Sequence, residues 1–294
     1  MTALIRHKER GYYEDPQTGE HLRSVTTILN QGMSKIPLKF WAANHTAQIA
    51  MENLEFLNDS VGNARSEKVA YDWLRKAHVR AADTRADIGS AVHALIEADI
   101  LGEPIAEGIV NDPNMQPYLR HFHQFVNDFK VTFHASEMVV ANYTHGYAGT
   151  LDCIFSSPFI GDGKPRIGDW KTGGELDVKG VYAEAGLQSA AYRHAEKAWL
   201  RDGRKVRMPK TFGGTIFHLR PEGLRVISVR CNQVMFEAFL TAKKNAEFVT
   251  DVAKTVVGKP IHPGPDHIWN ADQTCRYCGT TVNEVFNATE GEAA

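Results

Sequence analysis

The sequence predicts an α/β fold, on three observations. Two short strand-like runs, residues 147–155 and 166–172, are followed by a helical run over about 180–200. Helical runs occupy about 37–57, 66–79 and 81–101 before them. After them come a strand-like pair, 211–219 and 224–229, and a long helix over about 233–256. Strands that alternate with helices in this way are typical of an α/β domain.

Composition limits the class of protein. The 294 residues are 43% hydrophobic and 23% charged, as in ordinary soluble globular proteins. No apolar run approaches the roughly 18 residues that span a bilayer, and the N-terminus lacks the apolar segment of a signal peptide. The four cysteines show no disulfide-framework spacing, so we expect a cytoplasmic protein with no membrane contact. The net charge of −2 requires any DNA-binding surface to be a local basic patch.

The N-terminal region, residues 1–79, is predicted to hold a small hairpin followed by helices. Tyr12 and Tyr13 precede a turn at Asp15-Pro16 and are assigned to the hairpin. The helix over 37–57 carries Trp41, which we assign to the core; stacking on a nucleic-acid base is the alternative.

The helix over 81–101 carries Gly89, His93 and Glu97 at four-residue spacing, so all three share one face. Glycine inside a helix costs about 1 kcal/mol relative to alanine, which indicates that another backbone or a ligand approaches there. Neutral imidazole is a common metal ligand; the alternative is a histidine of the core or surface. The next helix, to about residue 130, carries His121 and His123, which we expect to be solvated.

The two strand-like runs at 147–155 and 166–172 carry the residues of a candidate site. Asp169 and Lys171 are two apart on a strand and project to the same face. If the two runs pair as a hairpin, Asp152 joins them. Two carboxylates beside an ammonium suit a hard divalent cation that also contacts substrate phosphate. The alternative is a solvated sheet face, but Asp152 and Asp169 lie within apolar runs, where an unpaired acid is costly.

Flanking segments add candidate contacts. The strand-like run 132–143 contains Glu137. The helix over about 180–200 carries Gln188 and Tyr192 on one ridge, able to touch a phosphate or the surroundings of the lysine. The run 201–210 has five basic residues, which form either a solvated loop or phosphate contacts.

The C-terminal tail, residues 259–294, contains half of a metal-binding signature, Cys275-x-x-Cys278. His262 and His267 can complete a four-ligand Zn²⁺ site, although the order of the ligands is not that of a standard zinc finger. The alternative is a tail without a metal.

Together these motifs resemble the PD-(D/E)XK nuclease superfamily, and within it the RecB/Cas4-like exonucleases common in bacteriophage genomes. The resemblance covers about residues 80–200 and extends to the run Ser24–Ala43. It rests on five motifs in order, namely Gly89…His93…Glu97, Glu137, Gly149-Thr150-Leu151-Asp152, Asp169-Trp170-Lys171 and Gln188-x-x-x-Tyr192.

The resemblance implies a restriction-endonuclease-like core over residues 80–258, a mixed central β-sheet flanked by helices. It implies that Mg²⁺ or Mn²⁺ is held by His93, Asp152, Asp169 and the backbone carbonyl of Trp170. Lys171 would orient or deprotonate the attacking water, Gln188 and Tyr192 would steady the lysine and the DNA, and Glu137 would assist. Some relatives hold a [4Fe–4S] cluster on four cysteines. This chain has no cysteine before Cys153, so we expect no such cluster.

The function expected from these residues is a metal-dependent DNA exonuclease. It would hydrolyse phosphodiester bonds in single strands or at duplex ends through a metal-activated water, in phage or bacterial DNA recombination, repair or processing. The location would then be the bacterial host cytoplasm, and a recombination or replication protein is a possible partner. Two alternatives remain: a non-catalytic DNA-end-binding or recombination accessory protein on the same fold, and an adaptor whose zinc-bound tail recruits a partner.

Overall fold

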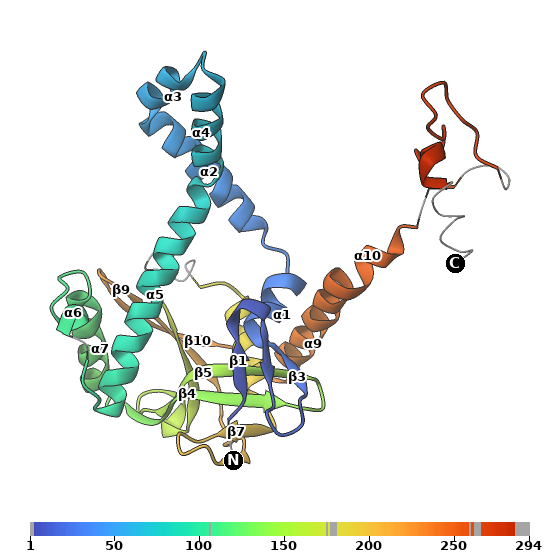
Figure 1. Cartoon of the computed structure of the whole chain (residues 1–294). Helices are drawn as coiled ribbons and strands as arrows, with labels where there is room; N and C mark the ends of the chain where they lie inside the picture. Colours follow the sequence, from blue (N-terminus) through green and yellow to red (C-terminus); the bar gives the residue numbers. More distant parts are fainter. Residues whose placement is uncertain are drawn as a thin grey trace. The chain divides into compact units, whose positions relative to one another are not determined.

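The computed structural model describes residues 3–105, 107–174, 176, 181–258, 260–261 and 266–285. It confirms the predicted α/β class, because helices cover a mixed β-sheet (Figure 1). The chain divides into two compact units, Met1–Ala246 and Glu247–Ala294. The first unit contains all the strands of this sheet and the helices that cover it.

Ten strands of the described chain form the sheet. They are β1 (Ile5–His7), β2 (Tyr12–Glu14), β3 (His21–Ser24), β4 (Thr132–Asn142), β5 (Tyr147–Ser156), β6 (Arg166–Lys171), β7 (Lys197–Trp199), β8 (Lys205–Arg207), β9 (Gly214–Arg220) and β10 (Gly223–Val229). Their order is β1-β2-β3-β5-β4-β7-β8, and β6 joins β5 to the β9–β10 hairpin. The pairs β3–β5 and β6–β9 are parallel and the others are antiparallel.

Strand β5 is central because it pairs along both edges. Strand β4 follows one edge from end to end in antiparallel register. The other edge is shared: β3 pairs with residues 147–148 and β6 pairs with residues 153–155. Residues 149–152 therefore lie where β3 and β6 diverge, and no described strand pairs with them on that edge. We call this place the β3–β6 fork.

The helices of the first unit are α1 (Val25–Gly32), α2 (Ile36–Glu52), α3 (Leu54–Ser60), α4 (Ala64–Arg75), α5 (Ala77–Leu101), α6 (Glu107–Val110), α7 (Gln116–Asp128), α8 (Glu184–Arg193) and α9 (Gln233–Glu247). Helix α9 ends one residue beyond the unit boundary. A π-helical turn (Phe248–Val252) and α10 (Ala253–Val256) belong to the second unit. Short 3₁₀ turns occur at Lys8–Arg10 and Gly161–Gly163.

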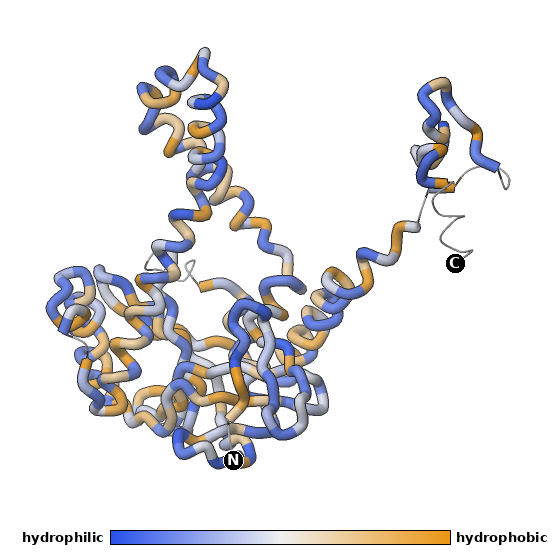
Figure 2. The backbone as a smooth tube through the Cα atoms, in the orientation of Figure 1, coloured by the Kyte–Doolittle hydropathy of each residue, from blue (hydrophilic) through white to orange (hydrophobic). Residues whose placement is uncertain are grey.

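Hydrophobic clusters on both faces of the sheet hold the helices in place. One cluster joins α1, α8 and α9 to the strands through side chains such as Ile28, Ala190 and Phe239. The other joins α5 and α7 to the strands through Leu95 and Phe122. Figure 1 shows these helices against the sheet, and Figure 2 shows hydrophobic residues following the strands and their covering helices. Burial of each large apolar side chain contributes about 1.5–3 kcal/mol, so α5 and α8 are firmly held beside β5.

Helix α2 packs differently. No side chain of α2 is buried, and the predicted core position of Trp41 is wrong. Its indole is half-buried, stacked on His45 at a ring distance of 5.5 Å and covered by the guanidinium of Arg85 at 5.1 Å. Tertiary contacts of α2 are instead made along α4 and α5. Trp41 therefore stacks on a histidine and an arginine, whereas a core position would have surrounded it with apolar side chains.

Several predicted boundaries differ from the observed ones. The helix expected over 37–57 is observed as α2 and α3, and the helix expected over 66–79 ends at Arg75. The helix expected over 180–200 ends at Arg193, because Ala198 and Trp199 are buried in β7 beside β4 and β8. The helix expected over 233–256 is interrupted by the π-helical turn at 248–252. The division expected at residue 79 does not separate the hairpin from the core, since β3 pairs with β5.

A search of the described helices for bilayer-spanning candidates finds none with the required length and hydropathy.

Candidate functional site

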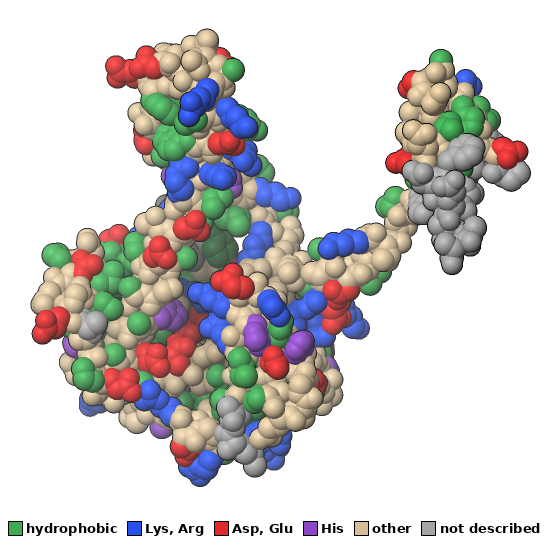
Figure 3. Space-filling view, in the orientation of Figure 1, with side chains coloured by type: hydrophobic (Ala, Val, Ile, Leu, Met, Phe, Trp, Pro, Cys, Tyr) green, Lys and Arg blue, Asp and Glu red, His purple; other side chains and the backbone are tan. Residues whose placement is uncertain are grey.

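The predicted site residues of the first unit line a single cavity of about 230 Å³. It is lined from β5 at the β3–β6 fork, from β4 and β6, and from helices α5 and α8. Figure 3 shows acidic side chains and a histidine gathered in a hollow beside α5. The seven predicted side chains in the lining are His93, Glu137, Asp152, Asp169, Lys171, Gln188 and Tyr192.

Two of the acids come from adjacent strands. Strands β5 and β6 pair antiparallel through Cys153↔Gly168, which places Asp152 opposite Asp169. Oδ2 of Asp152 accepts a hydrogen bond of 2.7 Å from the backbone N–H of Trp170. This bond holds the Asp152 carboxylate against β6, and the spacing of the sequence alone did not indicate it.

Strand β4 brings a third acid to the same place. Ser136 and Met138 pair with Cys153 and Leu151 of β5, so Glu137 lies opposite Asp152. The backbone φ of Glu137 is +47°, a left-handed conformation that residues other than glycine rarely adopt. Backbone strain of this kind costs about 1–3 kcal/mol and concentrates at functional sites.

Helix α5 places His93 between these acids and β6. Its Nε2 lies 3.2 Å from the carbonyl oxygen of Trp170. Its Nδ1 lies 3.7 Å from Oδ2 of Asp152 and 3.9 Å from Oε1 of Glu137. Neutral imidazole carries one N–H. When that N–H faces the carbonyl, the Nδ1 lone pair faces two carboxylates, and this arrangement is favourable only with a proton or a metal cation between them.

The electrostatics of the cluster lead to the same conclusion. Burial disfavours the protonated imidazole, but the nearby carboxylates of Glu137, Asp152 and Asp169 outweigh it and raise the pKa of His93 to about 9. Burial and the neighbouring Asp169 raise the pKa of the Asp152 carboxyl to about 7. The ligand atoms of His93, Glu137 and Asp152 all lie within 4.8 Å of one another. The cluster therefore attracts positive charge, whether a proton or a metal ion.

Lys171 faces the same cavity and pairs with Asp169. Its Nζ lies 2.6 Å from Oδ2 of Asp169 and 3.5 Å from Oε1 of Gln188. Burial disfavours the ammonium, but Asp169 and Asp152 outweigh it and raise the pKa of Lys171. The lysine therefore remains charged at neutral pH.

Helix α8 supplies the link between Lys171 and the rest of the site. Nε2 of Gln188 donates to Oδ1 of Asp169 at 3.1 Å and to the hydroxyl oxygen of Tyr192 at 3.2 Å. The Tyr192 ring lies against Gly149 of β5, where a Cβ would come within 2.6 Å of its Cε1. Gln188 thus contacts both Asp169 and Lys171, and Tyr192, one helical turn further on, contacts Gln188. The four-residue spacing predicted that these two side chains lie on one face of the helix.

The face of α5 that carries His93 also contains Gly89 and Glu97. A Cβ at Gly89 would lie 3.1 Å from Oγ1 of Thr172, so the close approach expected there is made by a side chain. Burial and the charge of Glu137 raise the pKa of Glu97, which places a further carboxylate in the field of the cluster.

Sequence reasoning missed the contribution of the N-terminal strands. Arg6 of β1 and Tyr13 of β2 also line the cavity, and the Tyr13 hydroxyl hydrogen-bonds Oγ1 of Thr150 at 2.9 Å. Tyr13 is buried. The only sequence signal was the predicted hairpin at Tyr12-Tyr13, which gave no indication of its partner strand.

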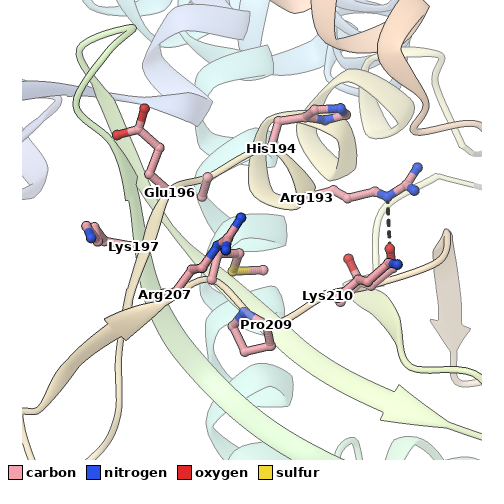
Figure 4. Close-up of a pocket in the computed structure, with 10 residues that line it drawn as sticks. Arg193, His194, Glu196, Lys197, Arg207, Pro209 and Lys210 are labelled. Atoms are coloured by element: carbon pink, nitrogen blue, oxygen red, sulfur yellow. Dashed lines mark hydrogen bonds between the residues drawn. The ribbon is translucent and has the colours of Figure 1, made fainter.

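A larger cavity, of about 860 Å³, lies at the C-terminal end of α8 (Figure 4). Its charged lining comprises Arg193, Lys197, Arg207, Lys210 and Glu196. Arg193 donates to the carbonyl of Thr211 at 3.0 Å, and Glu196 accepts the backbone N–H of Tyr143. With one carboxylate among its lining residues, this cavity lacks the paired acids of the smaller one. Part of the predicted basic run 201–210 lies here and not at the β3–β6 fork.

The histidines expected to be solvated have contacts at the surface. Nε2 of His121 lies 3.1 Å from the carbonyl oxygen of Pro221, and Nε2 of His123 lies 2.8 Å from Oδ1 of Asp99. His123 is exposed. Neither residue lines the 230 Å³ cavity.

The second unit holds another cluster of metal-ligating side chains, namely His267, Cys275 and Cys278. Sγ of Cys278 lies 3.3 Å from Nδ1 of His267. Burial disfavours the Cys275 thiolate, but the backbone N–H groups of Cys278 and Tyr277 outweigh it and lower the pKa of Cys275 to about 6. Three of the four residues predicted for the tail thus converge, whereas His262 lies outside the described residues.

Comparisons with known proteins do not assign the chain to a family. No protein-family model matches it, and no curated protein matches it. A solved structure described as "Crystal structure of SSO0001" is similar at 11% sequence identity, covering 78% of this chain and 76% of that chain, with a TM-score of 0.34. A likeness of this size supports no conclusion about fold or function.

Proposed function

We propose that the chain is a metal-dependent deoxyribonuclease whose active site is the 230 Å³ cavity at the β3–β6 fork. The observation that carries the proposal is convergence: side chains from five elements and from residues 93 to 192 meet in one cavity. Three carboxylates that meet in one cavity repel one another, and the single ammonium of Lys171 offsets only part of their charge, so a further cation would stabilise the cluster.

The donor set fits a hard divalent cation. Carboxylate oxygens are the ligands that Mg²⁺ and Mn²⁺ prefer; Glu137 and Asp152 would hold the ion, with the imidazole of His93 as a third ligand. The resemblance implies Asp169 as a metal ligand, but its carboxylate is paired with Lys171. Glu137 would therefore be the second carboxylate ligand. Oδ2 of Asp169 lies 2.6 Å from Nζ of Lys171, so Asp169 would hold the ammonium beside the ion instead of binding the ion directly. A bound cation would lower the pKa of a water and neutralise charge on the phosphate.

The chain's own side chains would divide the remaining work. The raised pKa of Lys171 keeps it as an ammonium, so it acts as a fixed positive charge that orients the water and the scissile phosphate, not as the base. Gln188 holds Asp169 in place through a bond of 3.1 Å. Preorganised charges of this kind account for a large share of catalysis, because they need no reorganisation during the reaction.

The arrangement also supports the restriction-endonuclease-like core expected from the motifs. Asp152, Asp169 and Lys171 lie at the diverging ends of two paired strands, and the helices on either face supply His93 and Gln188. DNA as the substrate, exonucleolytic action, and a role in recombination, repair or processing rest on the motif resemblance. The cytoplasm of a bacterial host is the location that fits that role.

The test compares cleavage of end-labelled DNA by the wild-type chain, Lys171→Met and Asp169→Asn, with Mg²⁺ or Mn²⁺. Each variant removes one fixed charge and is expected to lower the rate by about 100- to 1,000-fold. Lys164→Met is the matched control, because Lys164 is exposed and does not line the cavity. Undiminished cleavage by both site variants would contradict the assignment.

Linear and covalently closed circular DNA, single- and double-stranded, separate exonuclease from endonuclease action in the same assay. We expect cleavage of linear substrates alone. Retention of DNA without cleavage of any of these substrates would favour the accessory-protein alternative.

A further inference from the structure

The described part of the tail, residues 266–285, has an ordered backbone around three potential metal ligands. The ligand atoms of His267, Cys275 and Cys278 all lie within 4.8 Å of one another. Neither cysteine is in a disulfide. Tetrahedral Zn²⁺ holds sulfur at about 2.3 Å and nitrogen at about 2.0–2.1 Å, so its ligand atoms lie less than about 5 Å apart.

We propose that His267, Cys275 and Cys278 bind Zn²⁺, and that this ion stabilises the fold of the tail. This site is separate in chemistry from the oxygen-rich cluster of the first unit.

The backbone around the cysteines is shaped to aim both sulfur atoms at one point. The N–H of Gly279 donates to the carbonyl of Cys275 at 2.9 Å and closes a tight turn over Cys275-x-x-Cys278. Gly279 has a φ of +71°, a conformation that other residues adopt at a cost. Turns of this kind bring two cysteines to the same side of the chain, as a chelating pair requires.

A second set of contacts brings the histidine to that turn. Trp269 and Cys275 form an antiparallel bridge, and the N–H of Arg276 donates to the carbonyl of Ile268 at 2.8 Å. The segment that carries His267 is therefore fixed beside the segment that carries the cysteines.

An independent observation is that this part of the tail has almost no hydrophobic core. Cys275 is the only buried side chain among residues 266–285. The large apolar side chains there are exposed: Ile268 by 39%, Trp269 by 37% and Tyr277 by 52%. Segments this short need a disulfide, a metal or a partner to remain folded. A structural Zn²⁺ supplies that folding free energy directly.

Other metals fit less well. Mg²⁺ prefers oxygen ligands, which this group lacks. A [4Fe–4S] cluster takes four cysteines, and the remaining cysteines, Cys153 and Cys231, are buried in the hydrophobic clusters of the first unit. Two sulfurs and an imidazole nitrogen are the usual donors of structural zinc sites.

The first test measures metal content by elemental analysis in the untagged full-length chain, purified directly and after addition of Zn²⁺ followed by gel filtration. We expect one zinc and no iron per chain. Cys275→Ser, Cys278→Ser and His267→Ala should each weaken zinc binding by more than about 100-fold, since loss of even an outer contact costs about 10- to 100-fold. Cys231→Ser and His123→Ala are matched controls that should retain the zinc.

The second test replaces Zn²⁺ by Co²⁺ and records the thiolate-to-metal charge-transfer absorption. We expect this absorption in the wild-type chain and its loss in Cys275→Ser. Thermal unfolding should show that the first unit of each variant is folded, so that loss of metal cannot be attributed to global unfolding. The proposal is overturned if both cysteine variants retain zinc, if the chain takes up iron in its place, or if added Zn²⁺ and Co²⁺ fail to bind.

Discussion

The described residues contain two clusters of potential metal ligands that include a histidine, and the two differ in donor atoms and in the packing that supports them. In the first unit, His93 lies with the carboxylates of Glu137 and Asp152. In the second, His267 lies with the sulfurs of Cys275 and Cys278. The first cluster rests on a ten-stranded sheet with a hydrophobic cluster on each face, whereas the segment around the second has one buried side chain among the described residues 266–285. Under the two proposals above, the first site is formed by the protein fold before any metal binds, whereas the fold of the second would depend on Zn²⁺.

The largest effect expected is on stability, from removing an aromatic side chain beneath the first site. Phe217 of β9 is fully buried and its ring lies 4.4 Å from that of Trp170 and 4.7 Å from that of Phe125. Phe217→Ala should lower the free energy of unfolding by about 3–5 kcal/mol. Tyr277→Ala in the tail, where the side chain is 52% exposed, should change it by less than about 0.5 kcal/mol.

Urea unfolding monitored by circular dichroism measures both variants against the wild-type chain. A comparable loss of stability in Tyr277→Ala would show that the tail has a packed core of its own, and the contrast between the two clusters would then fail.

The next prediction concerns a variant of the first site that should lose DNA cleavage without losing thermal stability. Asp152→Asn removes a carboxylate from the proposed metal site while retaining an oxygen that can accept the Trp170 N–H. We expect DNA cleavage to fall by about 100- to 1,000-fold. In metal-free buffer the thermal midpoint should stay level or rise, because the buried Asp152 carboxylate faces the like charges of Asp169 and Glu137.

Cys275→Ser is the counterpart of this variant in the tail. It is expected to lose zinc and to keep the first unit folded, whereas Asp152→Asn should keep its zinc. If Asp152→Asn cleaves DNA at the wild-type rate, the first cluster is not the catalytic site, although the zinc assignment would be unaffected.

Local patterns accounted for the elements that carry the site, but not for their partners. The strand predicted at 147–155 is observed as Tyr147–Ser156, and the helix predicted at 81–101 as Ala77–Leu101, because alternation and four-residue spacing are properties of a single segment. The sequence could not predict that Arg6 and Tyr13 line the cavity, because the strands that carry them reach it through the pairing of β3 with β5, which joins segments more than 120 residues apart. The predicted C-terminal end of the helix over 180–200 was wrong for a related reason, because burial of Ala198 and Trp199 in the sheet overrides their helical propensity.

The smallest effects expected come from two glycines, one beside each cluster, that are required for different reasons. At Gly149 the requirement is space, because a Cβ would lie 2.6 Å from Cε1 of the buried Tyr192. At Gly279 the requirement is conformation, because φ is +71° and no atom of the described residues lies within 4 Å of the added Cβ. Gly149→Ala should cost about 1–3 kcal/mol through overpacking, and Gly279→Ala should cost about 1–2 kcal/mol through backbone strain.

The two variants are distinguished by what they disturb. Gly149→Ala displaces Tyr192 and, through the 3.2 Å bond to Gln188, the partner of Asp169, so cleavage should fall while zinc content is unchanged. Truncating the ring should relieve the clash, and Gly149→Ala combined with Tyr192→Ala should therefore lose less stability than the sum of the two single variants. Gly279→Ala should instead weaken zinc binding, and Gly279→Asn should weaken it less, because asparagine adopts the left-handed conformation more readily than alanine. Additive losses of stability in Gly149→Ala and Tyr192→Ala would contradict the role given to Gly149. Equal zinc affinity with Gly, Ala or Asn at position 279 would contradict the role given to Gly279.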